Sequence, residues 1–366
     1  MSIKDLKMEA KTVVSILGIR PDLIRCSEII KKFDKEFNHT LVWSGQHFDY
    51  MLSDVFFNEL EIRRPDYDLQ MGKEFKTHHS LSGMIGSKVI DLMESEKIKP
   101  DAFFFLGDSN SVVAALALKK EYGDKIKNIH CEAGMRSYDK RMLEEINRTV
   151  CDHCSDIHFV YHEDYKENLT RENLPANNIY VVGNTIVEVC NKLKDKIMSQ
   201  PKTKNFILMD IHRPENFKYK NRLENIIKFG NYCNSYFRVP VRILKFSRTD
   251  SAIKEFNIDL GSIETIDLMS YKDFLSVQYH SLFMISDSGT AQEEPILLKT
   301  PVIVPRDFTE RPQSVWNDCS FMLNVNIDNE FESAIRWLNS NPKMETEWLG
   351  DGKTSDKIVE ILKDKL

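Results

Sequence analysis

The 366-residue sequence has no long hydrophobic run, and no window reaches the roughly 18–20 apolar residues that a membrane-spanning helix needs. Residues 1–11 are polar and charged, so we expect no secretory signal. The sequence also lacks a basic excess, since 50 Lys and Arg face 56 Asp and Glu for a formal net charge of −6. Nucleic-acid binding needs a basic field, so we expect neither a nucleic acid nor a membrane as a partner.

Cysteine is scarce, scattered and odd in number, with seven residues in the whole chain. One cluster, Cys151-Asp152-His153-Cys154, has the spacing of half a zinc site, but no second pair lies at a suitable distance. We therefore expect no metal, and a buried pair of thiols on a helix. Scattered reduced thiols are typical of a cytoplasmic protein.

Glycine-rich phosphate motifs are absent as well. The turn Gly18-Ile19-Arg20-Pro21 has one glycine where a dinucleotide fingerprint needs three, and residues 83–88 miss the P-loop spacing. No fixed-period repeat or low-complexity linker is present. The composition, 42% hydrophobic and 29% charged, excludes wholesale disorder, and the length suits two compact domains.

Short apolar runs alternate with longer segments of helical period along most of the chain. Continuous apolar runs are typical of strands buried on both faces, so the alternation predicts parallel sheets covered by helices. The predicted strands are Thr12–Leu17, Thr40–Trp43, Ala102–Leu106, Asn128–Cys131, Ile157–Val160, Ile179–Val182, Phe206–Ile211, Val239–Leu244, Leu282–Ile285 and Pro301–Val304. The predicted helices include Asp22–Phe33, Ser109–Glu121, Glu163–Glu172, Thr185–Ile197, Arg222–Phe237 and Ser355–Lys365.

This pattern restarts within residues 183–201. We therefore predict an α/β protein with two doubly wound Rossmann-like domains that face a central cleft. The first domain covers residues 1–183 and the second covers 184–354, while a last helix at 355–366 packs back onto the first. Ligands of such folds bind at the carboxyl ends of the strands, so the residues after each strand are the candidates for function.

Carboxylates stand at these positions in the first domain. Asp108 and Glu132 follow two predicted strands, and Glu144 opens a helix. Asp108 could act only as an N-cap, and Glu144 could form only a helical ion pair with Arg148. Together, however, the three carboxylates are what proton transfer uses, because crowding can separate the pKa values of an acid and a base.

Phosphate-compatible groups follow other strands. Arg20 stands near the N-terminus of a predicted helix, which is a natural anion site. In the second domain, His212 and Arg213 offer a titratable group and a permanent cation to a diphosphate. Ser288 and Gly289, at a predicted helix start, are typical of a phosphate-binding turn.

These residues fall into an ordered set of motifs that resembles the non-hydrolysing UDP-N-acetylglucosamine 2-epimerase family, whose members have the two-domain GT-B fold. The matches cover about residues 12–315. They are Gly18-Ile19-Arg20-Pro21, Ser44-Gly45-Gln46-His47, Gly107-Asp108-Ser109-Asn110, Glu132-Ala133-Gly134-Met135-Arg136, Glu144-Glu145-Ile146-Asn147-Arg148, Gly183-Asn184-Thr185, His212-Arg213-Pro214-Glu215-Asn216, Asp287-Ser288-Gly289-Thr290, Gln292-Glu293-Glu294 and Thr309-Glu310-Arg311-Pro312.

The resemblance implies epimerisation at C2 of a UDP-2-acetamido sugar, most simply UDP-GlcNAc to UDP-ManNAc, for a surface-polysaccharide precursor. Anti elimination of UDP would leave a bound glycal, which is then protonated at C2 while UDP is added back. This chemistry needs no cofactor, and the family likeness implies a homodimer.

The resemblance also implies roles for individual residues. The catalytic set is Asp108, Glu132, Glu144 and His212. The substrate or UDP contacts are Arg20, Arg25, Gln46, Arg136, Arg213, Glu215, Asn216, Ser288, Gly289, Thr290, Glu294 and Arg311, with Glu294 expected at the ribose hydroxyls. The chain departs from the usual pattern at Asp22 (for Glu), Leu143 (for Pro), Gln313 (for Glu) and Phe246-Ser247 (for His-Pro in the nucleotide pocket).

Three alternatives stay open. Gly45-Gln46-His47-Phe48-Asp49-Tyr50 and Val55-Phe56-Phe57 are similar to relatives that act on UDP-2,3-diacetamido uronic acids or 6-deoxy UDP-hexosamines. A hydrolysing relative would accumulate UDP and free sugar, and a GT-B glycosyltransferase would need an acceptor. A binding module without catalysis would have lost the three carboxylates, all of which are present.

Overall fold

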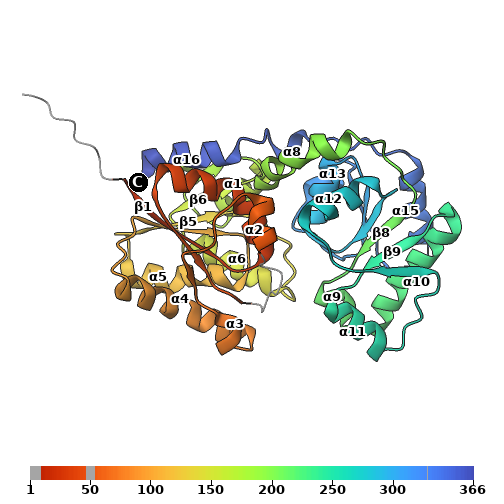
Figure 1. The fold of residues 1–366 in the computed structure, drawn as a ribbon, viewed down its shortest axis with the longest axis horizontal. Helices are drawn as coiled ribbons and strands as arrows, with labels where there is room; N and C mark the ends of the chain where they lie inside the picture. Colours follow the sequence, from red (N-terminus) through yellow and green to blue (C-terminus); the bar gives the residue numbers. More distant parts are fainter. Residues whose placement is uncertain (1–9, 47–53, 328) are drawn as a thin grey trace, which may run out of the picture. The chain divides into compact units, whose positions relative to one another are not determined.

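The computed structural model describes residues 10–46, 54–327 and 329–366, and it contains two parallel β-sheets, each covered by helices (Figure 1). Their contacts divide the chain into two compact units. Unit 1 comprises the described residues of 1–136, 142–189 and 350–366, and unit 2 comprises those of 137–141 and 190–349. The division falls inside helix α8 (Thr185–Met198).

The sheet of unit 1 has the strand order β3-β2-β1-β4-β5-β6-β7, with every pair parallel. Its strands are β1 (Thr12–Leu17), β2 (Asn38–Trp43), β3 (Tyr67–Asp68), β4 (Ala102–Leu106), β5 (Lys127–Cys131), β6 (Ile157–Val160) and β7 (Ile179–Val181). Its helices are α1 (Arg20–Glu36), α2 (Asp54–Leu60), α3 (Met71–Glu74), α4 (His78–Ser95), the 3₁₀ helix η1 (Asn110–Val113), α5 (Ala114–Tyr122), α6 (Leu143–His153), α7 (Glu163–Arg171), η2 (Ala176–Asn178) and α16 (Thr354–Lys365).

Strand β4 shows why a continuous apolar run forms a central strand: all five of its residues have no exposed surface. Phe103 and Phe105 pack in one cluster with residues of α4 and α5. Phe104 contacts Phe33 of α1 edge to face, with ring centroids 5.1 Å apart. Helix α16 packs along α1, as Figure 1 also shows, and ion pairs from Lys32 and Lys363 reinforce that contact.

The sheet of unit 2 has the order β10-β9-β8-β11-β12-β13 and is also parallel throughout. Its strands are β8 (Ile207–Asp210), β9 (Val241–Leu244), β10 (Ile263–Ile266), β11 (Met284–Ser286), β12 (Val302–Val304) and β13 (Ser320–Met322). Its helices are α9 (Pro214–Phe217), α10 (Lys220–Phe237), α11 (Ser247–Glu255), α12 (Tyr271–His280), η3 (Thr290–Gln292), α13 (Glu294–Leu297), α14 (Pro312–Trp316), α15 (Glu330–Asn339) and η4 (Glu347–Leu349).

Two parallel α/β domains with Rossmann-like strand order confirm the predicted fold class. The strands that the sequence did not predict, β3, β10 and β13, are all edge strands. An edge strand is covered on fewer sides and needs no continuous apolar run; β10 exposes Glu264 and Thr265. The segment predicted as a helix at Ser109–Glu121 begins instead with the 3₁₀ turn η1.

Strand order changes direction between β1 and β4 in unit 1, and between β8 and β11 in unit 2. At such a switch point, the connections after neighbouring strands leave in opposite directions and open a crevice at the carboxyl ends. None of the helices in the described part of the chain combines the length and the apolar character of a membrane span.

Candidate active site

A buried cluster of two carboxyl groups and one guanidinium group lies around the start of α1, directly after β1. Asp22 Oδ2 accepts hydrogen bonds from two backbone N–H groups (3.1 and 3.2 Å) and from Ser109 Oγ (3.1 Å). Arg25 Nη2 lies 3.4 Å from Asp22 Oδ1, and Arg25 Nη1 pairs with Glu132 after β5. Asp22, Arg25 and Glu132 are all at least 95% buried, so Arg25 is the charge partner of two enclosed carboxyl groups.

Burial raises the pKa of Asp22 to about 7, against the opposing effects of Arg25 and the two backbone donors. The charge of Asp108 contributes to this rise in pKa. Near neutral pH, Asp22 is therefore partly protonated, and Arg25 is then neutralised mainly by Glu132.

Asp108, which is half-buried, belongs to a second charge pair. Its carboxylate pairs with Arg148 of α6, which is 1% exposed and also contacts Glu145 Oε2 at 2.9 Å. Asn147 Nδ2 donates to the backbone carbonyl of Asp108 (3.0 Å). Glu144 lies half-buried in the first turn of the same helix.

Gly107 lies next to the Arg25–Glu132 pair and directly precedes Asp108 of the other pair. It has φ +77°, and a β carbon there would lie 3.2 Å from Arg25 Nη2 and 3.6 Å from Glu132 Oε2. A side chain at this position would press against the Arg25–Glu132 pair, so only glycine suits both the backbone and the space. Asp108 and Glu132 follow the neighbouring strands β4 and β5, and Gly107 lies between Asp108 and the Arg25–Glu132 pair.

Three other residues of unit 1 that were predicted to contact the substrate lie at separate positions. Arg20 is the first residue of α1 and is half-buried. Gln46 is 6% exposed, and its Nε2 would lie 2.3 Å from a β carbon at Gly18, so its amide packs on the turn after β1. Arg136 is engaged by Asp152 (2.8 Å) and Glu172 (2.6 Å). His47 and the rest of the predicted segment up to residue 53 lie outside the described residues.

In unit 2, His212 follows β8 and lies close to two buried aspartates. Its Nδ1 lies 2.9 Å from Asp210 Oδ1 and 3.5 Å from Asp287 Oδ1. Burial lowers the pKa of His212, but the charges of Asp210 and Asp287 and the hydrogen bond to Asp210 outweigh it, so the net pKa is raised. Phe246, one of the departures from the family pattern, packs its ring 5.0 Å from the imidazole.

Arg311 lies in a buried charge network after β12. Its Nε donates to Glu293 Oε1 (2.8 Å) and its Nη1 to Glu310 Oε1 (2.7 Å). Gly289 is required beside it, since a β carbon there would lie 2.4 Å from Arg311 Nη1. Arg306 also pairs with Glu310 (3.0 Å), so this carboxylate receives two guanidinium groups.

The remaining predicted residues of unit 2 surround these groups. Arg213 Nη2 lies 3.7 Å from Glu310, and Glu215 lies 3.7 Å from Arg306. Asn216 Nδ2 donates to Asp287 (2.8 Å). The turn after β11 holds Ser288 and Thr290, whose hydroxyls are 3.1 Å apart, and Glu294 accepts hydrogen bonds from Tyr271 (3.0 Å) and Gln278 (3.2 Å).

Several residues that organise these sites were not predicted from the sequence. They are Asp22, Glu145, Arg148, Asp210, Asp287, Arg306 and Glu310. Glu145, Arg148, Asp287 and Glu310 lie inside the motifs that carried the family resemblance, and their place in those motifs was the available signal. Of the predicted thiol pair, Cys151 is buried on α6 while Cys154, which caps it, is half-buried. Among the described residues, no group of three or more His, Cys, Asp or Glu could hold a metal.

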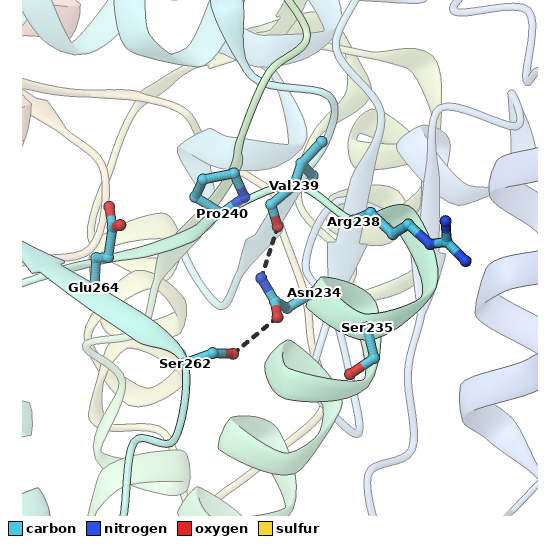
Figure 2. A pocket seen from close by; sticks show the side chains of 7 residues that line it. All are labelled: Asn234, Ser235, Arg238, Val239, Pro240, Ser262 and Glu264. Atoms are coloured by element: carbon cyan, nitrogen blue, oxygen red, sulfur yellow. Dashed lines mark hydrogen bonds between the residues drawn. The ribbon is translucent and has the colours of Figure 1, made fainter.

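A pocket of unit 2 lies away from these strand ends (Figure 2). Its polar lining is self-paired: Asn234 Nδ2 donates to the Val239 carbonyl (2.9 Å), and Ser262 Oγ donates to Asn234 Oδ1 (3.0 Å). Most of its residues precede β9 and β10. The pocket therefore lies at the amino ends of the strands, at the edge of the sheet opposite His212.

Comparison with known proteins shows the family to which this chain belongs. A family model described as UDP-N-acetylglucosamine 2-epimerase matches residues 31–363. The UDP-N-acetylglucosamine 2-epimerase of Methanocaldococcus jannaschii is 33% identical over 367 residues, covering 95% of this chain and 97% of that protein. The UDP-2,3-diacetamido-2,3-dideoxy-D-glucuronate 2-epimerase of Pseudomonas aeruginosa is 30% identical, covering 96% and 99%.

A crystal structure of the M. jannaschii enzyme in complex with UDP-GlcNAc and UDP matches the fold with a TM-score of 0.85 at 32% identity, covering 96% of this chain and 99% of that one. Fold and relatives together define an isomerase built from two Rossmann-like domains. The chain belongs to the UDP-N-acetylglucosamine 2-epimerase family.

Proposed function

We propose that this protein epimerises C2 of a UDP-2-acetamido sugar, most simply converting UDP-GlcNAc to UDP-ManNAc without net hydrolysis. The observation that carries the proposal is the pair of carboxylates at the ends of the neighbouring strands β4 and β5. Asp108 is held by Arg148, and Glu132 is held by Arg25. Since Leu106 and Cys131 are register partners, the two strands end at the same level of the sheet; Glu132 follows its strand directly and Asp108 follows after Gly107.

The proposed reaction has two balanced halves. In the first, a carboxylate accepts the proton from C2, the C–H electrons form the C1=C2 bond, and the C1–O bond breaks with its electrons left on UDP. In the second, C2 of the glycal receives a proton on the opposite face while a phosphate oxygen of UDP attacks C1. The proton leaves from one face and returns to the other, so two acid–base groups are needed, and Asp108, Glu132 and Glu144 are the candidates.

Unit 2 is proposed to bind the nucleotide. UDP carries more negative charge after it leaves, so fixed cations stabilise it more strongly than the intact substrate. Arg311 and Arg213 supply that charge, together with His212, whose pKa its two aspartates raise. Arg20, Ser288, Gly289 and Thr290 are assigned to the phosphates, and Glu294 to the ribose hydroxyls.

The first test is proton NMR of the purified protein with UDP-GlcNAc in D2O. The proposal expects UDP-ManNAc with deuterium at C2 and little free UDP. Free ManNAc together with UDP would favour the hydrolysing reaction instead. If UDP-GlcNAc is unchanged, the same assay with a UDP-2,3-diacetamido uronic acid tests the second candidate, which the likeness to the P. aeruginosa enzyme supports.

We also propose that the product is a precursor of a surface polysaccharide and that the enzyme works as a homodimer. Both points rest on the family resemblance. Light scattering after size-exclusion chromatography tests the second, and a monomer mass in the active fraction would refute it.

A further inference from the structure

His130 is a fully buried histidine that the proposed reaction does not use. It lies on β5, two residues before Glu132. Its Nε2 is 2.8 Å from the carbonyl oxygen of Gly107, and its Nδ1 is 2.6 Å from Asp152 Oδ1. The side chain therefore connects the residue preceding Asp108 to helix α6.

The two contacts determine the protonation of His130. A carbonyl oxygen can only accept, so Nε2 carries a hydrogen, and the carboxylate of Asp152 accepts from Nδ1 in the same way. Burial lowers the pKa of His130, but Cys151 and Asp152, which face it from α6, raise it well above the ordinary value. Burial also raises the pKa of Asp152, but His130 and Arg136 hold it below its usual range.

A chain of alternating charges compensates this buried imidazolium. Asp152 Oδ2 lies 2.8 Å from Arg136 Nη1, and Arg136 donates to both oxygens of Glu172 at 2.7 and 2.6 Å. The cations Arg136 and His130 thus alternate with the anions Glu172 and Asp152. The series runs from the half-buried Glu172 to the fully buried His130. A buried ion pair persists when its members are paired and hydrogen-bonded in this way. Arg136, which the resemblance assigns to the substrate, has in this structure the role of anchoring Asp152.

At the inner end of this chain, the Gly107 peptide lies between His130 and the Arg25–Glu132 pair. Its carbonyl accepts from His130, while its α carbon faces Arg25 and Glu132. Glycine has a wide choice of backbone angles, so an external hydrogen bond is needed to hold one of them. The next residue is Asp108, whose direction depends on this peptide.

We propose that His130 is a positioning residue for this site: its hydrogen bond to Gly107 orients the Asp108 carboxylate relative to Glu132. The part that concerns turnover rests on the proposed function. The part that concerns the Gly107 peptide can be tested without any substrate.

Three variants separate positioning from general stability. His130→Leu removes the donor, and His130→Gln places an amide donor near the position of Nε2. His158→Leu is the matched control, because His158 is the register partner of His130 on β6, is 1% exposed, and contacts the backbone carbonyl of Asp152 (2.7 Å). We expect kcat to fall about 10- to 100-fold in His130→Leu with KM within about threefold of wild type, the range for a small misplacement of a reacting group. His130→Gln should recover most of kcat, and folded His158→Leu should retain it.

Crystal structures of the same variants give a readout that needs no activity. The proposal expects the Gly107 carbonyl and Asp108 to move in His130→Leu and to stay in place in His158→Leu. Unchanged positions, or an equal loss of kcat in both leucine variants, would overturn it. If His130→Leu does not fold, ¹⁵N NMR of wild type at neutral pH decides, because a His130 ring without a hydrogen on Nε2 contradicts the proposal. If wild type turns over no UDP-sugar, the proposed function fails while these structural outcomes still judge His130.

Discussion

At the scale of single residues, the described parts of both units show the same arrangement. A carboxylate that follows a strand is held by a guanidinium group: Glu132 by Arg25 and Asp108 by Arg148, both distant in sequence, and Glu310 by the adjacent Arg311. A buried pair of this kind is costly to break, because the remaining charge is left without compensation. For any substitution at these positions, the stability of the variant must therefore be measured together with its activity.

Glu132→Gln keeps the shape of the side chain and removes its basicity. We expect kcat to fall by about 10²–10⁴-fold, the usual contribution of a general acid–base group, while UDP affinity stays unchanged. Steady-state kinetics and UDP titration calorimetry measure the two effects. Glu188→Gln, the same change on α8, is the control, and full turnover in Glu132→Gln would remove Glu132 from the mechanism.

Arg311→Lys keeps a positive charge but loses the planar fork that contacts both Glu293 and Glu310. We expect UDP affinity to weaken by about 1.5–3 kcal/mol, the range for a hydrogen bond to a charged group, with kcat less affected. Calorimetry measures the affinity, and thermal unfolding monitors the fold. Arg242→Lys, which alters the partly exposed pair with Glu264 on β9 and β10, should bind UDP as wild type does. Equal affinities in the two variants would refute the role of Arg311.

At the scale of helices, the described contacts tie α16 to α8 and α1. Glu188 of α8 accepts hydrogen bonds from Ser355 N (3.0 Å) and Ser355 Oγ (3.1 Å), in the first turn of α16. Burial raises the pKa of Glu188 from 4.5 to about 7. The C-terminal helix is therefore held by a carboxyl group that binds its proton more tightly in the folded state.

This shift makes stability depend on pH. Between about pH 4.5 and about pH 7 the folded state binds more protons at Glu188 than the unfolded state does, so the unfolding free energy falls as pH rises through that window. Asp22, with its pKa raised to about 7, acts in the same direction. In Glu188→Gln, we expect the decline measured by urea denaturation between about pH 5 and pH 8 to be shallower. Glu360→Gln, at an exposed position of α16, is the control, and an unaltered slope in Glu188→Gln would contradict the argument.

At the scale of the whole molecule, the two units carry different parts of the proposed chemistry. The carboxylates assigned to proton transfer lie in unit 1, and most groups assigned to UDP lie in unit 2. UDP alone should therefore act mainly on unit 2. At 100 times its Kd, a ligand adds about 2.7 kcal/mol to the stability of the part that binds it.

Hydrogen exchange with and without UDP tests this division. We expect protection in peptides around β8, β11 and the Arg311 loop, and much less around β4 and β5. Urea unfolding followed by tryptophan fluorescence should shift with UDP as well, since Trp316, Trp337 and Trp348 lie in unit 2 and only Trp43 lies in unit 1. Protection confined to unit 1 would reverse the assignment.

Most of the fold could be predicted because the signals are local. A run such as Ala102–Leu106 is apolar at every position, which is typical of a strand buried on both faces, and the structure has β4 with those bounds. The short edge strands β3, β10 and β13 carry no such run, so their pairing depends on the rest of the sheet. Candidate carboxylates could be found for the same local reason: each stands directly after a strand or opens a helix.

The sequence by itself determined the alternation of strands and helices, the absence of a basic field, and the motifs that identify the family. Only the tertiary structure decided which charges meet. Arg25 and Glu132 are 107 positions apart, and Asp108 and Arg148 are 40 apart, yet each pair forms a direct contact. Such contacts arise from strand order and from the helices that cross between strands. No spacing along the chain therefore reveals that His130 contacts the carbonyl oxygen of Gly107.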